Sequence, residues 1–491
     1  MKPTYKILLL TAAIIGTLSS CKKLNENPDS VIVSSQFYKT ASDANSAVNA
    51  VYSTLNSDPA GDFPLYGRQL NLLTDNAGDD QIYSPSNTNP DVRALGTETY
   101  ISSNSRIQKV WQQLYYGINR ANIAIDNIPA IQMDTATNAR LVRESKFIRA
   151  LLYFNLVRLY GDVPLILHNP TSIDLSSLQV PRTNIDTVYS QIITDLKAAT
   201  NLPKSYTGAN IGRATGGAAH ALLAKVYVTR KQWANALTQL NTVINGGYGY
   251  ALFPNFRDAF QKPTKNGVEH IFSVQFETNL GAVNSTQYLS QSFVSFNTAT
   301  FPIDIPADSS VYKLYSANDT RRAVTFYSSV YNAATGQTVV YNNAYTPYYN
   351  KFVDYSLTPL TTQAQSGINY PVIRYSDVLL LYAEVQNELN GAPTPDAYAS
   401  INKVRTRAGI ANLTAGLSQA SFRDSVFLER RKEFIQEGNR WFDLVRQGET
   451  ALLTAVHKLP AKSAASSKNI LFPIPLVEVQ LNPLLKQNPG Y

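Results

Sequence analysis

Apolar residues recur at helical spacing over long stretches in both halves of the chain. In residues 41–56, Ala44, Val48, Val51 and Leu55 fall on one face of a helix. The same spacing predicts further helices over residues 110–128, 138–165 and 184–203. The N-terminal half is therefore expected to be largely helical.

Residues that start or stop helices flank two of these segments. Gly161 and Pro164 follow the apolar run of 138–165, where a flexible residue and a residue without an N–H end a helix. Thr183 or Asn184 can cap the next helix, because a side-chain oxygen there accepts a hydrogen bond from a free backbone N–H. These positions predict where the helices begin and end.

Residues 212–252 have the pattern of a helix hairpin. Ala224 and Ala236 lie twelve residues apart, and a bulky residue follows each of them one turn later. Small residues at a helix crossing with a bulky residue one turn on are typical of tetratricopeptide repeats. Residues 375–410 contain a second helical pair, with a longer connection. The two pairs predict a scaffold of stacked, tetratricopeptide-like helix pairs.

The middle of the chain has a different pattern. Polar and apolar residues alternate over 269–279, which predicts a strand, and over 324–343, which predicts two strands around a turn. Most of 253–373 is expected to be loops and short strands. The chain is expected to end in an extended, proline-marked tail over 471–491. The fold class is thus mostly α, with irregular loops and short β-hairpins.

The N-terminus has the pattern of an export signal. Lys2 and Lys6 precede about a dozen largely apolar residues, which is well short of the roughly 20 that span a bilayer. Leu18-Ser19-Ser20-Cys21 follows and resembles a bacterial lipoprotein box, in which the cysteine is lipidated and becomes the mature N-terminus. Cys21 is the only cysteine of the chain. The alternative is an ordinary secretory peptide with an incidental cysteine.

Composition narrows the class of protein. The chain has 491 residues, 44% hydrophobic and 16% charged, as in globular proteins. Its net charge is 43 − 35 = +8, or 41 − 35 = +6 without the signal's two lysines, and the excess forms no Lys/Arg-rich block. Nucleic acid is therefore not expected as a partner. No apolar run after residue 18 is long enough to span a membrane.

Motifs for cofactors and metals are missing from the sequence. It has neither GxGxxG nor GxxxxGK[ST], and its four histidines are scattered without the spacing of metal ligands. We therefore expect no cofactor and no metal.

Three glutamates are candidates for catalysis. Glu429, Glu433 and Glu437 recur every four residues on one predicted helix face, and two carboxyl groups about 5–9.5 Å apart can hydrolyse a glycosidic bond. A hydrolase could combine Glu433 or Glu437 with an acid from the Asp79–Asp80 loop. The arginines and lysine interleaved with the glutamates favour ion pairing instead. We expect a structural role and no enzyme activity.

Aromatic residues in loops are the better candidates for binding. The sequence has 30 tyrosines and three tryptophans, and each tryptophan lies in a segment that predicts scaffold packing. Aromatic rings can stack on sugar rings while amides and carboxylates bind hydroxyls. The candidate ligand-binding residues are Asp79, Asp80 and Tyr83 in residues 72–87, Tyr288 and Phe296 in residues 284–297, and Tyr345 in residues 341–352.

Six segments together resemble the SusD/RagB family, in the family's order. They are ESKFIRALLYFNLVRLYGDVPL, GRATGGAAHALLAKVYV, IRYSDVLLLYAEVQNEL, INKVRTRAGI, FLERRKEFIQEGNRWFDLVRQGE and LFPIPLVEVQLNPLLKQNPGY. The resemblance covers essentially the whole mature chain. It implies a signal peptide over 1–20, a lipidated tether over 21–39, an N-terminal SusD-like helical region over 40–252, the loop and strand region over 253–373 and a C-terminal SusD/RagB region over 374–491.

The resemblance also implies a function and a partner. Members of this family are nutrient-binding lipoproteins of the Bacteroidetes outer membrane that sit over a SusC-like TonB-dependent transporter. This predicts a non-catalytic, lipid-anchored protein of the outer membrane, exposed at the cell surface, that binds an oligosaccharide or polysaccharide and delivers it to the transporter. A peptide ligand and a lipid-anchored glycoside hydrolase remain the alternatives.

Overall fold

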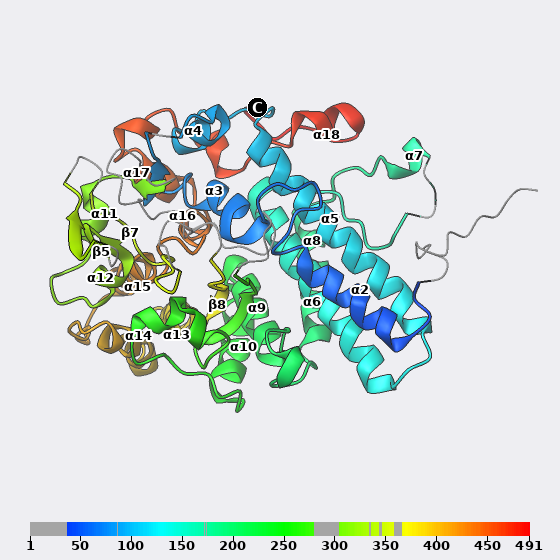
Figure 1. Ribbon diagram of the computed structural model, residues 1–491, viewed down its shortest axis with the longest axis horizontal. Coiled ribbons are helices and arrows are strands. Elements are labelled where there is room, and N and C mark those ends of the chain that lie inside the picture. The colour runs from blue at the N-terminus through cyan, green and yellow to red at the C-terminus, as the bar shows by residue number, and fades with distance from the viewer. Residues whose placement is uncertain are drawn as a thin grey trace, which may run out of the picture.

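The computed structural model describes residues 37–85, 87–170, 172, 174–278, 304–332, 335–342, 346–357 and 366–491. Long helices dominate these residues (Figure 1). They are α2 (Ala41–Ser53), α3 (Leu70–Thr74), α4 (Pro90–Gly96), α5 (Ser105–Asn127), α6 (Thr135–Tyr160), α7 (Leu175–Leu178), α8 (Ile185–Ala199), α9 (Gly216–Thr229), α10 (Trp233–Asn245), α11 (Ser309–Lys313), α12 (Arg321–Thr325), α13 (Tyr375–Asn390), α14 (Pro395–Arg407), α15 (Gln419–Glu433), α16 (Arg440–Gln447), α17 (Glu449–Val456) and α18 (Leu476–Leu481).

The strands are short and pair two by two. β1 (Gln81–Tyr83) pairs with β3 (Asp304–Pro306), β2 (His270–Val274) with β8 (Tyr370–Arg374), β4 (Phe326–Tyr327) with β7 (Tyr348–Tyr349), and β5 (Ser329–Asn332) with β6 (Gln337–Val340). All four pairs are antiparallel. The mostly α fold with few short strands is thereby confirmed, and the helices form the tetratricopeptide-like scaffold that the sequence predicts. Among the described strand pairs, only β5 and β6 form a hairpin, because the other pairs join strands that do not follow one another in the chain.

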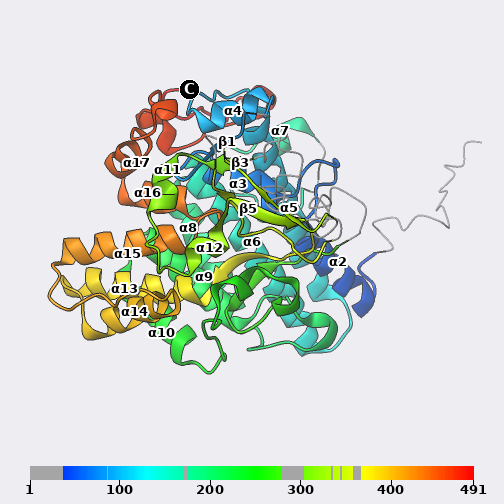
Figure 2. The same cartoon turned by 60° about the vertical axis from the view of Figure 1, so that its left-hand side comes forward.

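The helices pack as a series of neighbours. α5 packs on α6, α6 on α8, α8 on α9, α9 on α10, α10 on α13, and α13 on α14 and α15. In Figure 2, α13, α14 and α15 lie together at one end of the molecule and α2 lies towards the other. One large apolar core runs through both helical regions, from Ala44 in α2 to Leu485 near the C-terminus. This shared core positions the loops that carry the candidate residues.

Local signals account for several helix boundaries. α6 ends at Tyr160 because Gly161 adopts a φ of +74°, which favours glycine. The side chain of Asn184 accepts a hydrogen bond from the N–H of Asp186 and caps α8, as the sequence predicts. α5 begins five residues before the predicted start, because Asn104 caps it there.

The C-terminal tail differs from the prediction. It contains the short helix α18, where the N–H of Val479 donates to the carbonyl of Pro475. The rest of the tail is extended and is fixed by side-chain hydrogen bonds: Asn488 Nδ2 donates to the carbonyls of Tyr160 and Phe472. The proline at 475 precedes the helix and does not interrupt it.

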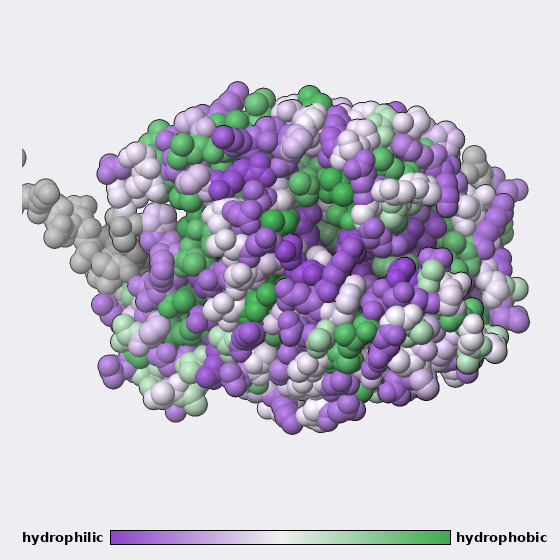
Figure 3. Space-filling model, turned by 180° about the vertical axis from the view of Figure 1, so that it is seen from behind, coloured by the Kyte–Doolittle hydropathy of each residue, from purple (hydrophilic) through white to green (hydrophobic). Residues whose placement is uncertain are grey.

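Seen from behind, the surface mixes hydrophilic and hydrophobic patches, and no single broad apolar area stands out on that face (Figure 3). Within the described part of the chain, no helix combines the length and the apolar character needed to cross a membrane.

Candidate functional site

The three candidate glutamates lie in a buried ion-pair network. The Arg374 guanidinium, at the end of β8, donates to Glu269 at 2.5 Å, to Glu433 at 2.8 Å and to both oxygens of Glu437 at 2.8 Å. None of these side chains is more than 2% exposed. Glu429 is also buried, and accepts from Arg405 at 2.8 Å. These carboxylates are buried and ion-paired with arginines. They therefore link β8 to α15 and are not accessible to a substrate.

Two details of the sequence prediction change here. The ion pairing is confirmed, but the partners of Glu429, Glu433 and Glu437 come from other elements, not from the interleaved arginines. Glu437 also lies beyond the end of α15, because Gln436 has a φ of +65°. The three glutamates therefore do not share one helix face.

The charge of Glu433 is fixed by its neighbours. Burial alone disfavours the ionised form, but Arg407, Arg374 and Arg321 outweigh it and hold the pKa of Glu433 well below its ordinary value. A general acid needs a carboxyl group that still holds a proton near neutral pH. Glu433 is therefore unsuited to that role.

Asp79 and Asp80 are likewise buried, each 4% exposed. Arg440 binds both oxygens of Asp79 at 2.7 and 2.9 Å, and Arg431 donates to Asp80 at 2.6 Å. Burial opposes the ionisation of Asp79, yet Arg440 and Arg431 hold its pKa well below the ordinary value. In the structure this pair ties the loop after α3 to α15 and α16.

Tyr83 is more accessible than the two aspartates. It ends β1 and is half-buried, with the Arg93 guanidinium 5.0 Å from its ring centroid. Its ring also packs against Gly96, where an added Cβ would lie 2.7 Å away. Tyr83 pairs with Asp304 of β3, the first described residue after 279–303.

The other candidates, Cys21, Tyr288, Phe296 and Tyr345, lie outside the described residues. The described residues that follow Tyr288, Phe296 and Tyr345 in the sequence lie near one another. β3 begins at Asp304, eight residues after Phe296, β7 begins three residues after Tyr345, and β3 packs beside β7. Tyr349 in β7 is fully buried and donates its hydroxyl proton to the carbonyl of Asp80. The described ends of the three predicted loops therefore lie near one another.

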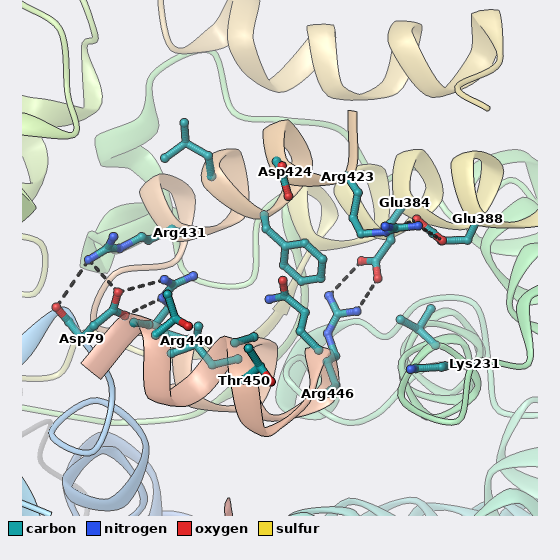
Figure 4. Close-up of a pocket in the computed structure, with 18 of the residues that line it drawn as sticks. Asp79, Lys231, Glu384, Glu388, Arg423, Asp424, Arg431, Arg440, Arg446 and Thr450 are labelled. Carbon is teal, nitrogen blue, oxygen red and sulfur yellow. Dashed lines mark hydrogen bonds and ion pairs between the residues drawn. The ribbon is translucent and has the colours of Figure 1, made fainter. Parts of the chain in front are cut away.

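A cavity of about 880 Å³ lies elsewhere, between α15, α16 and α17 and the turn from α9 to α10 (Figure 4). Arginines line it, and each already binds a carboxylate. At one end Arg431 and Arg440 hold Asp79, and at the other Arg423 binds Glu388 at 2.6 Å. Arginines paired in this way offer an anionic ligand little free charge.

Apolar side chains complete the wall of this cavity. Phe427 lies beneath the Arg446 guanidinium, 4.7 Å from ring centroid to carbon, and Leu428 is 45% exposed. Trp233, the first residue of α10, also lines the cavity, although the sequence indicates only scaffold packing for it. Nothing in the local sequence of Trp233 reveals this, because the opposite wall comes from a helix some 200 residues later. Trp111 and Trp441 are buried in the core, as predicted.

The described residues contain no candidate metal site. Among them, no three His, Cys, Asp or Glu side chains gather in a way that could hold an ion.

The fold and its buried network define a class: a tetratricopeptide-like helical protein whose loops adjoin short pairs of strands. Two family models match the chain, one described as SusD family over residues 288–491 and one as starch-binding associating with outer membrane over residues 24–228. The chain belongs to the SusD/RagB family.

Known proteins agree with this assignment. The SusD-like protein P2 of Formosa agariphila is 28% identical over 100% of this chain and 99% of its own length. The crystal structure of a SusD homolog from Bacteroides thetaiotaomicron shares the fold, with a TM-score of 0.80 and 24% identity over 93% of this chain and 98% of that one. A laminarin-binding SusD-like protein has a TM-score of 0.77 and 25% identity over 92% of this chain and 100% of that one.

Proposed function

We propose that this protein is a non-catalytic lipoprotein of the outer membrane that binds a glycan and delivers it to a SusC-like TonB-dependent transporter. The observation that carries the non-catalytic part is the burial of Glu429, Glu433 and Glu437 with arginine partners. A glycosidase needs one protonated and one free carboxyl group flanking the sugar. The similarity to a laminarin-binding protein over nearly the whole chain supports a glycan ligand.

The ligand site that we propose is formed by the loops that carry Tyr83, Tyr288, Phe296 and Tyr345. Two observations support it: Tyr83 is half-buried at the end of β1, and the described ends of the other two loops lie at β3 and β7 nearby. Aromatic rings in loops on a rigid scaffold suit the apolar faces of sugars. The loop that leads to Tyr83 also carries Asp79 and Asp80, and their ion pairs with Arg440 and Arg431 hold it in position.

The test of binding is calorimetry on residues 22–491 with plant, fungal and host glycans and with protein digests. We expect saturable glycan binding that Tyr83→Ala weakens, and no new reducing ends on incubation. A response to digests alone would replace the glycan by a peptide. Release of reducing ends that Glu433→Gln abolishes would restore the hydrolase alternative.

Anchoring and delivery need their own tests in cells. Cys21→Ala is expected to move the protein from the membrane to the soluble fraction. The variant has no thiol to carry the acyl chains whose buried methylene groups would hold the wild type in the bilayer. Protease treatment of whole cells tests surface exposure. A TonB-dependent barrel is expected to co-purify with the wild-type protein from solubilised outer membranes, and its absence there would contradict the delivery role.

A further inference from the structure

Three cavities adjoin one another along a second part of the surface, which runs from α2 to α14 (Figure 1). Their volumes are about 300, 290 and 700 Å³. Ile211, Gly212 and Arg213 line both of the first two, and Tyr250 lines both the second and the third. We call this the tyrosine groove, after the tyrosines along it: Tyr52, Tyr206, Tyr248, Tyr250 and Tyr375.

The centre of the groove carries a stacked pair of rings. The centroids of Tyr248 and Tyr250 lie 5.8 Å apart with the planes 12° from parallel, and both residues are half-buried. Gly247 and Gly249 flank Tyr248 with φ angles of +72° and +76°, conformations that favour glycine. A Cβ added at Gly249 would meet no atom within 4 Å, so the backbone beside the rings is open.

The polar wall of the groove is held in place by its own contacts. Asn266 and Gln275 exchange two amide hydrogen bonds of 2.8 and 3.0 Å. Arg213 pairs with the buried Glu144 at 2.8 Å, a carboxylate that also pairs with Arg140, and Lys204 donates to the carbonyl of Gly246 at 2.7 Å. A wall that is already ordered loses little conformational entropy when a ligand binds.

Among the buried polar atoms of the wall that have no hydrogen-bond partner in the described residues is the Ser273 hydroxyl. Ser273 is 3% exposed and lines the two smaller cavities, and its hydroxyl makes no hydrogen bond with any described residue. Buried hydroxyls are almost always satisfied by protein, water or ligand. Ser273 therefore offers a hydrogen bond to a molecule in the groove.

We propose that the tyrosine groove binds a segment of a neutral glycan chain, as a second contact separate from the loops around Tyr83. Stacked tyrosine faces suit sugar rings, and the amides and Ser273 suit hydroxyls. Neither kind of contact requires a charge on the ligand. The inference rests on the proposed function for the class of ligand. A long chain that reaches both contacts gains affinity over a short one, because the second contact forms within one complex.

The test is calorimetry on residues 22–491 with maltohexaose, laminarihexaose and the corresponding polysaccharides. Tyr248→Ala is expected to weaken polysaccharide binding about five- to tenfold, the range of one aromatic stacking contact, and to affect hexasaccharides less. Tyr248→Phe keeps the ring and is expected to bind like the wild type. Tyr331→Ala, a tyrosine 60% exposed on β5, is the matched control and is expected to have no effect.

A second readout reports on the groove directly. In Tyr248→Trp, the tryptophan fluorescence is expected to change saturably with added hexasaccharide, relative to the wild type. If the wild type binds glycan but Tyr248→Ala binds as tightly and the Tyr248→Trp signal is unchanged, the groove is overturned and the proposed function stands. If the wild type binds neither these glycans nor any of the plant, fungal and host glycans, both are overturned.

Discussion

The network around Arg374 and the tyrosine groove use polar side chains in opposite ways. In the network, arginines and glutamates from β8, α14 and α15 are fully buried and satisfy one another. In the groove, charged side chains such as Arg213 and Lys204 lie beside half-buried tyrosines, which form much of the wall. The glutamates that the sequence suggests as catalytic candidates thus stabilise the fold, while the tyrosines of the groove form a surface that suits a neutral ligand.

The large cavity beside α15 lies between these two extremes. It is open and rich in charge, but its arginines are paired with Glu384, Glu388, Asp79 and Asp80. Size and charge alone would make it the first choice for a ligand site. The pairing of its arginines argues against an anionic ligand bound by them, because each guanidinium would have to leave a carboxylate to bind one.

The largest expected effect comes from breaking the network. Arg374→Met leaves Glu269, Glu433 and Glu437 buried with fewer cationic partners, and removing one partner of a buried pair costs about 3–5 kcal/mol. Urea denaturation of the mature protein measures this loss. Arg423→Met removes a half-exposed pair with Glu388 and is expected to cost only about 0–1 kcal/mol. If both variants lose the same free energy of unfolding, the buried network contributes no more to stability than an exposed ion pair.

The second effect is a dependence of stability on pH. Burial raises the pKa of Asp75 from 3.8 to about 7, although Asn71 and the Gly438 N–H donate to its carboxyl group. The folded state then holds the proton more tightly than the unfolded state, so stability is full at low pH and falls as pH rises from about 4 to about 7.

Between pH 5 and 7 this loss is about 2 kcal/mol, since one pKa unit corresponds to about 1.4 kcal/mol. Asp75→Asn cannot ionise, and its free energy of unfolding is expected to change less over the same range than that of the wild type. The measurement is the difference between the two urea curves at each pH. A constant difference from pH 5 to 7 would mean that Asp75 does not titrate in this range.

Much of the fold could be predicted from the sequence because it depends on local signals. The apolar spacing of α2, α5, α6 and α8 and the caps such as Asn184 act within a few residues. The ion-pair partners of Glu433 could not be predicted, since Arg321 and Arg374 come from elements more than 50 residues away. Which of several arginines reaches a glutamate is decided by tertiary packing.

The candidate site shows the same division. The sequence singles out Asp79 and Asp80 as polar loop residues, but not their burial, which follows from the approach of α15 and α16. The Gly-Gly-Tyr-Gly-Tyr stretch at 246–250 lies in the segment for which the sequence predicts only a helix hairpin. That its two rings stack over a groove depends on α2 and on β2, both distant in the chain.

A smaller effect on stability is expected in the groove. Tyr248→Ala removes a half-buried ring, and we expect a loss of about 1 kcal/mol, well below that of Arg374→Met. The same variant should lose glycan affinity while it unfolds cooperatively in urea. A loss of 3 kcal/mol or more would mean that Tyr248 is mainly a packing residue, and the contrast between network and groove would fail.

The smallest expected effect is on glycan binding at the large cavity. Trp233 is an aromatic residue in its wall, and on ring type alone it would be the first choice for a sugar platform. Its neighbours in that wall are charge pairs such as Arg446–Glu384, where sugar hydroxyls would compete with carboxylates for the same guanidinium donors. Calorimetry on Trp233→Ala is therefore expected to give the wild-type affinity for each glycan that binds. A loss as large as that in Tyr248→Ala would place sugar contacts in the charged cavity as well, because pairing of the arginines would then not prevent a neutral ligand from binding there.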